Sequence, residues 1–246
     1  MIHKTKKSFK WLRRGVIALF VVIAIAGVLF ILIEPIKDLI RGRYSDKAIE
    51  LFKEGEVTVA VPKTDALSVD GEDGQEVIQA DKIFKDLSAL NEDYESLTIV
   101  GLLEIPCIEV EEVVFDCAST LALRYGCGKF EGTVGIGEPG LCSVWGHRNQ
   151  GGNDNLDRLE ELQDSIGGTV YVTTPDYVRH EYEIVECIYV KDAEIMPFMY
   201  GDTYDDETLA IVTCGYGTNY KGDWHAYNTE FIVICKPTGT TEVFYE

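Results

Sequence analysis

Two side chains that are suited to covalent catalysis stand at the ends of apolar segments. His147 follows "LCSVW" and a glycine, and a polar, glycine-rich break comes after it. Cys214 ends the branched run "LAIVTC" and begins a glycine-rich loop. A residue at the end of a strand is exposed and is positioned by a rigid scaffold. Because a neighbouring imidazolium lowers the pKa of a thiol and makes it a nucleophile, the pair predicts cysteine–histidine catalysis if the fold brings the two ends together.

The remaining cysteines are expected to be small buried apolar residues rather than ligands or nucleophiles. No two of the seven form a C-x-x-C pair, which argues against a zinc cluster, and an odd number leaves at least one thiol free in any intramolecular pairing scheme. Acidic stretches such as "YGDTYDDE" could bind calcium, but they lack an EF-hand pattern. We therefore predict neither a metal nor a cofactor. The six cysteines other than Cys214 are Cys107, Cys117, Cys127, Cys142, Cys187 and Cys235.

The region from Thr98 onward predicts a mainly β domain of short strands. Runs rich in branched and aromatic residues are separated by glycine, proline and Asn/Asp clusters, which is typical of a sandwich or a barrel. Roughly 150 residues are enough for one such core. Leu156, Leu159 and Leu162 lie at three-residue spacing and predict one short helix directly after the histidine loop. The strand-like runs are "TIVGLLEIPCIEVEEVVF", "LCSVW", "GGTVYVTT", "HEYEIVECIYV", "LAIVTC" and "TEFIVIC".

The N-terminal region predicts a membrane anchor. Residues 1–14 carry basic side chains and no acid, and residues 15–33 contain no charge. At about 1.5 Å rise per residue, this apolar run is close to the length that spans a bilayer. A basic flank favours a cytoplasmic N-terminus and an extracellular C-terminal domain, anchored by a single pass. The alternative is a signal peptide cleaved after Ala24-Ile25-Ala26, but the apolar run continues beyond that point.

The segment between the span and the β domain, residues 34–80, is interpreted as a stalk and an acidic linker. In its first part, Glu34–Gly55, apolar residues at roughly helical spacing could extend the anchor as a stalk. Its second half, Pro62–Val77, is polar and rich in acids and glycine. A helix with Asp81 as N-cap is expected to follow, because Ile83, Phe84, Leu87 and Leu90 share one helical face. The predicted domain covers residues 81–246.

Charge differs between the two parts of the chain. Residues 1–47 hold ten Lys/Arg and three Asp/Glu, a net of +7, whereas residues 48–246 hold twelve and thirty-nine, a net of −27. The sum reproduces the net charge of −20 for the whole chain. So acidic a domain should repel nucleic acid, which excludes a nucleic-acid-binding function.

Several segments from about Thr98 to Lys236 resemble, in order, the sortases, which are cysteine transpeptidases of Gram-positive cell surfaces. "VGLLEIPCIEV" is similar to the first strand of the family, and "LRYGCGKFEGTVGIGEPGLCSVWGHR" to the stretch that ends in Gly-His-Arg. "NLDRLEELQDSIGGTVYVTT", "HEYEIVECIYV" and "IVTC" resemble the segments that follow, up to the threonine–cysteine signature. The Gly-His-Arg context is closest to classes C and D, whereas "TTPD" and the long loop after Cys214 resemble class B.

The resemblance implies an eight-stranded sortase-like β-barrel with short helices and a transpeptidase mechanism. The Cys214 thiolate would attack a carbonyl in an LPXTG-like sorting signal, and His147 would protonate the leaving amine. An amine of a peptidoglycan precursor or a pilin lysine would then resolve the acyl-enzyme. These steps agree with general chemistry, because an amide needs an acid to leave and a covalent intermediate divides a difficult step into two.

The sequence departs from the family at the arginine that opens the strand after the cysteine loop. That position falls on Glu230, and no arginine occurs after Arg179. An anion thus replaces a cation near a site that must stabilise negative charge. In "TEFIVIC", alternation should place Glu230, Ile232 and Ile234 on one face of the strand and the intervening residues on the other.

Three interpretations of Glu230 follow. Another donor could substitute for the arginine, or Glu230 could pair with His147 while backbone amides hold the oxyanion. The third possibility is a degenerate, slow or inactive sortase-like protein that binds a surface-protein or pilus peptide. Side chains that could contact substrate or replace the arginine are Arg148, Tyr216, Lys221, His225 and Tyr227.

Overall fold

The computed structural model describes residues 45–63, 94–148, 156–200, 204–215 and 229–245, together with residues 16, 17, 20, 23, 27, 217, 218, 224 and 225. Within these parts of the chain, no helix is both long and apolar enough to cross a bilayer. Most of the predicted span, most of the acidic linker and the expected helix at 81–90 lie outside the described residues.

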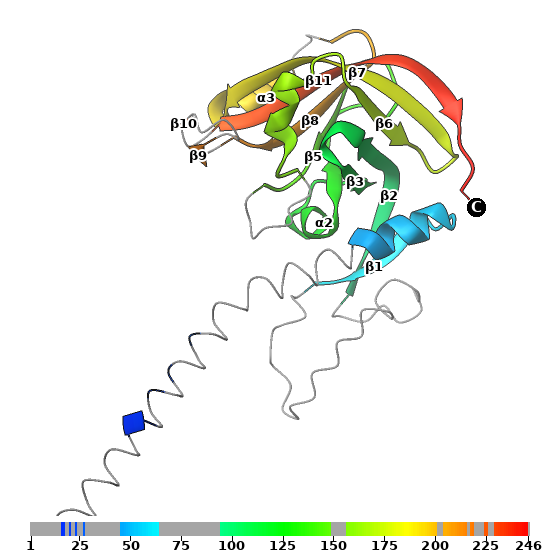
Figure 1. Ribbon diagram of the computed structural model, residues 1–246. Helices are drawn as coiled ribbons and strands as arrows, with labels where there is room; N and C mark the ends of the chain where they lie inside the picture. Colours follow the sequence, from blue (N-terminus) through cyan, green and yellow to red (C-terminus); the bar gives the residue numbers. More distant parts are fainter. Residues whose placement is uncertain are drawn as a thin grey trace, which may run out of the picture.

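Within the described residues, nine strands form one sheet in the order β1-β2-β3-β4-β5-β8-β11-β7-β6 (Figure 1). A further pairing joins β6 to β2, so that all of these strands except β1 form a closed ring. The mainly β prediction is therefore confirmed. The strands are β1 (Thr58–Pro62), β2 (Tyr94–Ile105), β3 (Val110–Phe115), β4 (Cys127–Lys129), β5 (Leu141–Trp145), β6 (Thr169–Thr173), β7 (Val178–Lys191), β8 (Thr208–Cys214) and β11 (Thr229–Glu242); the short β9 (Gly217–Thr218) and β10 (Trp224–His225) form a separate pair.

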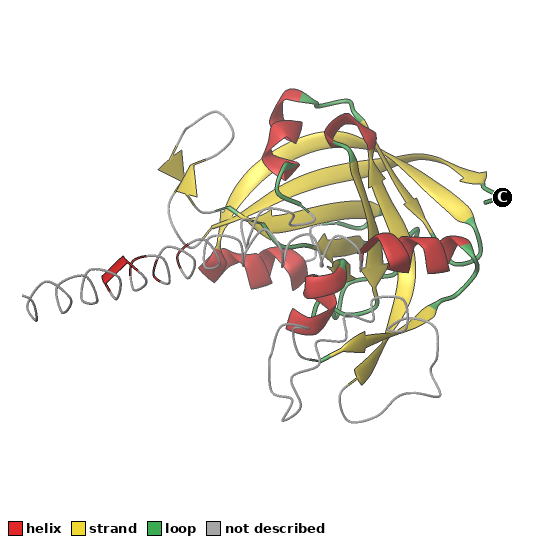
Figure 2. Ribbon diagram, turned by 60° about the horizontal axis from the view of Figure 1, so that its bottom comes forward, coloured by secondary structure: helices red, strands yellow, loops and turns green. Residues whose placement is uncertain are grey.

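Short helices surround the strands (Figure 2). The 3-10 helix η4 forms where the leucine spacing predicts a helical turn, and Leu156, Leu159 and Leu162 are all fully buried. The helix α3 connects β7 to β8 and was not predicted from the sequence. The bounds are η3 (Pro106–Ile108), α2 (Thr120–Tyr125), η4 (Leu159–Asp164) and α3 (Asp192–Tyr200).

Both faces of the ring are covered where β8 and β11 lie. One face contributes Ile211, Phe231 and Val233 to the main core, which also contains the leucines of the histidine loop and η4. The other face contributes Val212 and Ile232 to a second cluster, in which Ile195 and Met199 come from α3. The alternation predicted for β11 is confirmed, because Ile232 and Ile234 join the α3 side while Phe231, Val233 and Cys235 join the main core. Glu230 therefore begins a strand whose register is fixed by burial on both faces.

Residues 45–62 form two elements: a helix, in agreement with the helical spacing of apolar residues there, and the strand β1, which was not expected from the sequence. Residues 45–53 form a helix, and β1 pairs with β2 in antiparallel register. Phe52, Val59 and Val61 are buried in a third cluster with residues of β2, β3 and α2. The Tyr125 hydroxyl donates to the carbonyl of Pro62 at 2.9 Å. Part of the segment interpreted as a stalk thus packs against the sheet.

The packing of this helix predicts a stability effect. Phe52→Ala should lower the free energy of unfolding by about 3–5 kcal/mol, because it removes a fully buried aromatic ring and leaves a cavity. Urea unfolding of the full chain in detergent measures the change. Val57→Ala is the matched control, since Val57 is exposed in the same segment. Equal effects of the two substitutions would show that the helix does not pack as described.

Candidate active site

The parallel pairing of β5 with β8 brings His147 level with Cys214. Trp145 pairs with Val212 at the end of the ladder. The next residue continues it, because the Gly146 amide donates to the Val212 carbonyl at 3.0 Å. The Thr213 hydroxyl then donates to the Gly146 carbonyl at 2.9 Å. Since parallel strands end at the same edge of a sheet, one further step in this register sets His147 beside Cys214.

Glu230 flanks Cys214 from the other side. β11 is antiparallel to β8, and Glu230 and Cys214 are direct partners in its register. Cys214 lies two positions after Val212, and Glu230 two positions before Ile232. Because Val212 and Ile232 face α3, the side chains of Cys214 and Glu230 share that face. Cβ atoms of such a cross-strand pair lie about 4.5–5.5 Å apart. His147 and Glu230 are separated by the width of β8, which makes the thiol, rather than the imidazole, the nearest neighbour of the carboxylate in the register.

The surroundings of Cys214 disfavour its thiolate. The thiol is half-buried, and burial, followed by the charges of Glu230 and Asp192, raises its pKa to about 11. The main-chain hydrogen bond at Cys214 and the charge of Arg148 act in the opposite direction. Burial and the charge of Asp192 also raise the pKa of Glu230 to about 7. Asp192 is the first residue of α3, and nothing in its sequence context indicated a place near the site.

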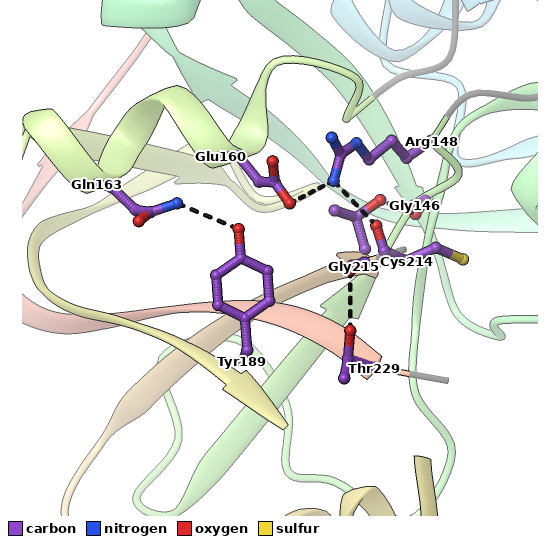
Figure 3. Close-up of polar contacts among 9 residues, drawn as sticks. Gly146, Arg148, Glu160, Gln163, Tyr189, Cys214, Gly215 and Thr229 are labelled. Atoms are coloured by element: carbon purple, nitrogen blue, oxygen red, sulfur yellow. Dashed lines mark hydrogen bonds and ion pairs between the residues drawn. The ribbon is translucent and has the colours of Figure 1, made fainter. Parts of the chain in front are cut away.

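Arg148 lies beneath the site rather than at its surface. Its side chain is only 5 % exposed. One guanidinium nitrogen, Nη1, donates to the carboxylate of Glu160 and, at 3.4 Å, to the carbonyl oxygen of Cys214. Figure 3 shows the guanidinium directed at the main chain of Cys214, while the sulfur points away from it. Arg148 is expected from the sequence to contact substrate or to replace the arginine, whereas its buried position favours a role within the protein.

An apolar surface begins next to the thiol. Val212 and Ile232, on the same face as Cys214, are buried under Ile195 of α3. The half-buried Trp145 continues this surface along β5 and stacks on Phe130 with ring centroids 4.9 Å apart. The face of the sheet that carries Cys214 is thus apolar beneath α3, while Glu230 and Asp192 border the thiol itself.

The remaining predicted side chains belong to the loop after Cys214. Tyr216, Lys221 and Tyr227 lie outside the described residues, and for His225 only the backbone pairing of β10 with β9 is described. Across the described residues, no three His, Cys, Asp or Glu side chains gather in an arrangement that could hold a metal ion. All seven cysteines are free thiols.

A family model described as the sortase domain matches residues 103–238, more than half of the chain. Similar solved structures include a sortase D5 transpeptidase from Clostridium perfringens, at 27% identity over 58% of this chain and 80% of that chain, with a TM-score of 0.47. Sortase C from Streptococcus pneumoniae matches at 20% identity over 59% and 69%, with a TM-score of 0.49. Sortase A from Listeria monocytogenes matches at 18% over 59% and 90%, with a TM-score of 0.47. Comparison with curated proteins gives no match.

The charge arrangement predicts the reactivity of the thiol. Glu230→Gln should lower the pKa of Cys214 and speed its alkylation several-fold at about pH 8, because it removes the largest opposing charge. Below about pH 7 the wild-type carboxyl is protonated, so the two proteins should converge there. Iodoacetamide labelling, followed by peptide mass mapping of Cys214, measures both effects. Glu242→Gln, at the exposed far end of the same strand, is the control, and an unchanged rate in Glu230→Gln would place the carboxylate away from the thiol.

Proposed function

The chain belongs to the sortase family, and on that premise we propose that it is a membrane-anchored transpeptidase that forms a thioester at Cys214. Its substrate would be an LPXTG-like C-terminal sorting signal of a surface protein or pilin. The acyl group would pass to an amine of a cell wall precursor or to a pilin lysine. No cofactor is required by these steps.

The observation that carries the proposal is the common edge at which β5 and β8 end. Support comes from the parallel register and the Gly146–Val212 hydrogen bond, which, extended by one residue, align His147 with Cys214 at neighbouring strand ends. A nucleophile beside a base is the arrangement that covalent catalysis needs. Because the two residues come from segments more than sixty positions apart, their proximity depends on the whole fold.

In the proposed mechanism, His147 takes the proton from the Cys214 thiol as Sγ attacks the scissile carbonyl carbon. The tetrahedral intermediate collapses when the carbon–nitrogen bond breaks, and the His147 imidazolium gives its proton to the leaving amine. A second amine then attacks the thioester. Its extra proton passes to His147, the carbon–sulfur bond breaks, and the thiol is restored, so protons and electrons balance over the cycle.

The apolar surface beside the thiol supports a peptide substrate. An extended peptide with an apolar side chain near its cleaved bond could place that side chain against the half-buried Trp145, which packs next to the fully buried Val212. The carbonyl to be attacked would then lie over Cys214. The carboxylates of Glu230 and Asp192 border the same place. They would attract an incoming amine as its ammonium cation, which must then lose a proton before it can attack.

The missing arginine leaves the oxyanion donor unassigned. Main-chain amides, or a side chain of the loop after Cys214 such as Lys221, His225 or Tyr227, would have to supply it. The direct pairing of Glu230 with His147 remains an alternative. Removal of one oxyanion donor lowers a rate by roughly 10²–10³, so we expect a slow enzyme rather than an inactive one.

A second candidate function follows from the raised pKa of Cys214. Two carboxylates and burial oppose its thiolate, which would suit a degenerate sortase-like protein that binds a surface-protein or pilus peptide without turnover. Such a protein would use the same apolar surface but would form no thioester.

The enzyme proposal predicts a covalent adduct. The purified full chain should gain the acyl mass of a sorting-signal peptide, and Cys214→Ala should abolish the adduct in intact-mass spectra. Cys107→Ala, which removes an exposed thiol elsewhere, should leave it intact. Equal peptide binding by wild type and Cys214→Ala, with no adduct for any peptide of a cleavage library, would support the binding-protein alternative instead.

Glu230→Arg tests the departure from the family. If Glu230 occupies the vacated arginine position, the substitution should raise the rate of acyl-enzyme formation, by up to about 10²–10³, because it restores an oxyanion donor. Glu230→Gln separates this effect from simple removal of the anion. A lower rate in both variants would indicate that Glu230 assists catalysis, as in the pairing with His147.

The location is proposed as the cell membrane, with the N-terminus in the cytoplasm. Protease treatment of intact cells should remove the β domain from a membrane-retained, full-length product. Recovery of a soluble product that begins near Gly27 would show instead that Ala24-Ile25-Ala26 is a signal-peptide cleavage site, and the anchor proposal would fail.

A further inference from the structure

The guanidinium of Arg148 joins three parts of the site that are distant in sequence. Arg148 follows His147 directly, so its main chain belongs to the histidine loop. Its Nη1 donates both to Glu160 on η4 and to the carbonyl oxygen of Cys214 at the end of β8. A single side chain thus connects the histidine loop, the strand β8 that ends at Cys214, and η4 (Figure 3).

Glu160 is held by a rigid neighbourhood. Its side chain is 1 % exposed, and the flanking Leu159 and Leu162 are fully buried in the main core. Gln163 donates to the Tyr189 hydroxyl at 3.3 Å, which ties η4 to β7. Tyr189 in turn contacts Phe231, the residue after Glu230. A carboxylate fixed in this way can orient the guanidinium that binds it.

The position of Arg148 also matters for charge. The sulfur of Cys214 and the contact of Arg148 lie on different sides of the same main chain (Figure 3). Glu230 and Asp192 oppose the thiolate, whereas Arg148 is the charge that favours it. Charges act more strongly in a buried, low-dielectric setting than in water. A cation behind the Cys214 peptide can therefore offset part of the anionic rim.

We propose that Arg148, oriented by Glu160, is a positioning residue that fixes the main chain of Cys214 relative to His147 and supplies the cation behind the thiol. The proposal rests on the proposed function of Cys214 as nucleophile. Arg148 touches neither substrate nor reacting atoms in this role. It acts through the carbonyl that it holds and through its charge.

The pair is not expected to add much net stability. The second carboxylate oxygen of Glu160 is buried and accepts no hydrogen bond from any described residue. Buried ion pairs that are incompletely satisfied can often be replaced by apolar side chains of similar size without loss of stability, whereas removal of one partner alone leaves a buried charge and is strongly destabilising. The decisive variant is therefore the double substitution Arg148→Met/Glu160→Met.

The double variant should fold with a urea midpoint close to that of the wild type but should react more slowly. A displacement of about 1 Å at the nucleophile can cost roughly 10²-fold in rate, so acyl-enzyme formation at saturating peptide should fall by about that factor. The peptide concentration at half-maximal rate should change little, because Arg148 does not contact the peptide. Alkylation of Cys214 at about pH 8 should also become slower, since a favourable cation is lost.

Arg148→Lys separates charge from geometry. A lysine keeps the cation but cannot present the planar guanidinium fork. It should therefore preserve the alkylation rate better than the double variant while still slowing acylation. Arg179→Met/Glu104→Met is the control, because it removes another ion pair between strands, β7 and β2, whose side chains are partly exposed and which faces the far end of β11, away from Glu230.

The two readouts distinguish failure of this inference from failure of the proposed function. If wild-type protein forms no acyl-enzyme, the proposed function fails, and slower Cys214 alkylation in the double variant still supports the role of Arg148. Wild-type acylation and alkylation rates in a folded Arg148→Met/Glu160→Met protein would overturn the inference. An equal loss in the Arg179→Met/Glu104→Met control would also overturn it, because the effect would then be general.

Discussion

The site depends on the parallel pairing of β5 with β8 within a largely antiparallel ring. β5 and β8 run in the same direction, so their C-terminal ends meet at one edge, and the register continues through Gly146 to the level of Cys214. An antiparallel pairing would put the histidine and the cysteine at opposite ends of the ring. β11 completes the site on the other side of β8, where Glu230 pairs directly with Cys214. Both faces of β8 are buried, so a slip by one residue would turn the thiol into the core.

Electrostatics distinguishes this site from a simple thiol–imidazole pair. Burial and two carboxylates raise the pKa of Cys214, and Arg148 offsets them from beneath the strand. The thiol therefore depends on a proton acceptor for its reactivity, which is the role proposed for His147. The same arrangement explains why the exchange of an arginine for Glu230 has two consequences. In the proposed mechanism it would remove a donor from the oxyanion, and it adds a negative charge next to the Cys214 thiol.

Alternation and leucine spacing were sufficient to predict the β domain, the faces of β11 and the helical turn after the histidine loop. These features depend on local burial, which leaves a periodic trace in the sequence. The strand β1 and the packing of the helix at residues 45–53 were missed, because their apolar residues cover a surface supplied by β2, β3 and α2, and that surface cannot be recognised in the local sequence. Asp192 and Glu160 were missed for the same reason. Glu160 lies between leucines in the sequence, and its partner in the interior, the guanidinium of Arg148, comes from another segment.

The central claim is that the parallel register sets residue 147 beside Cys214, and a bifunctional thiol reagent tests it directly. His147→Cys introduces a second thiol at the proposed place of the imidazole. Treatment with a short bis-alkylating reagent, followed by peptide mass mapping, should yield a single cross-linked species that joins positions 147 and 214. Two separately alkylated peptides with no cross-link, in protein that retains its fold, would show that the ends of β5 and β8 do not meet and would contradict the account.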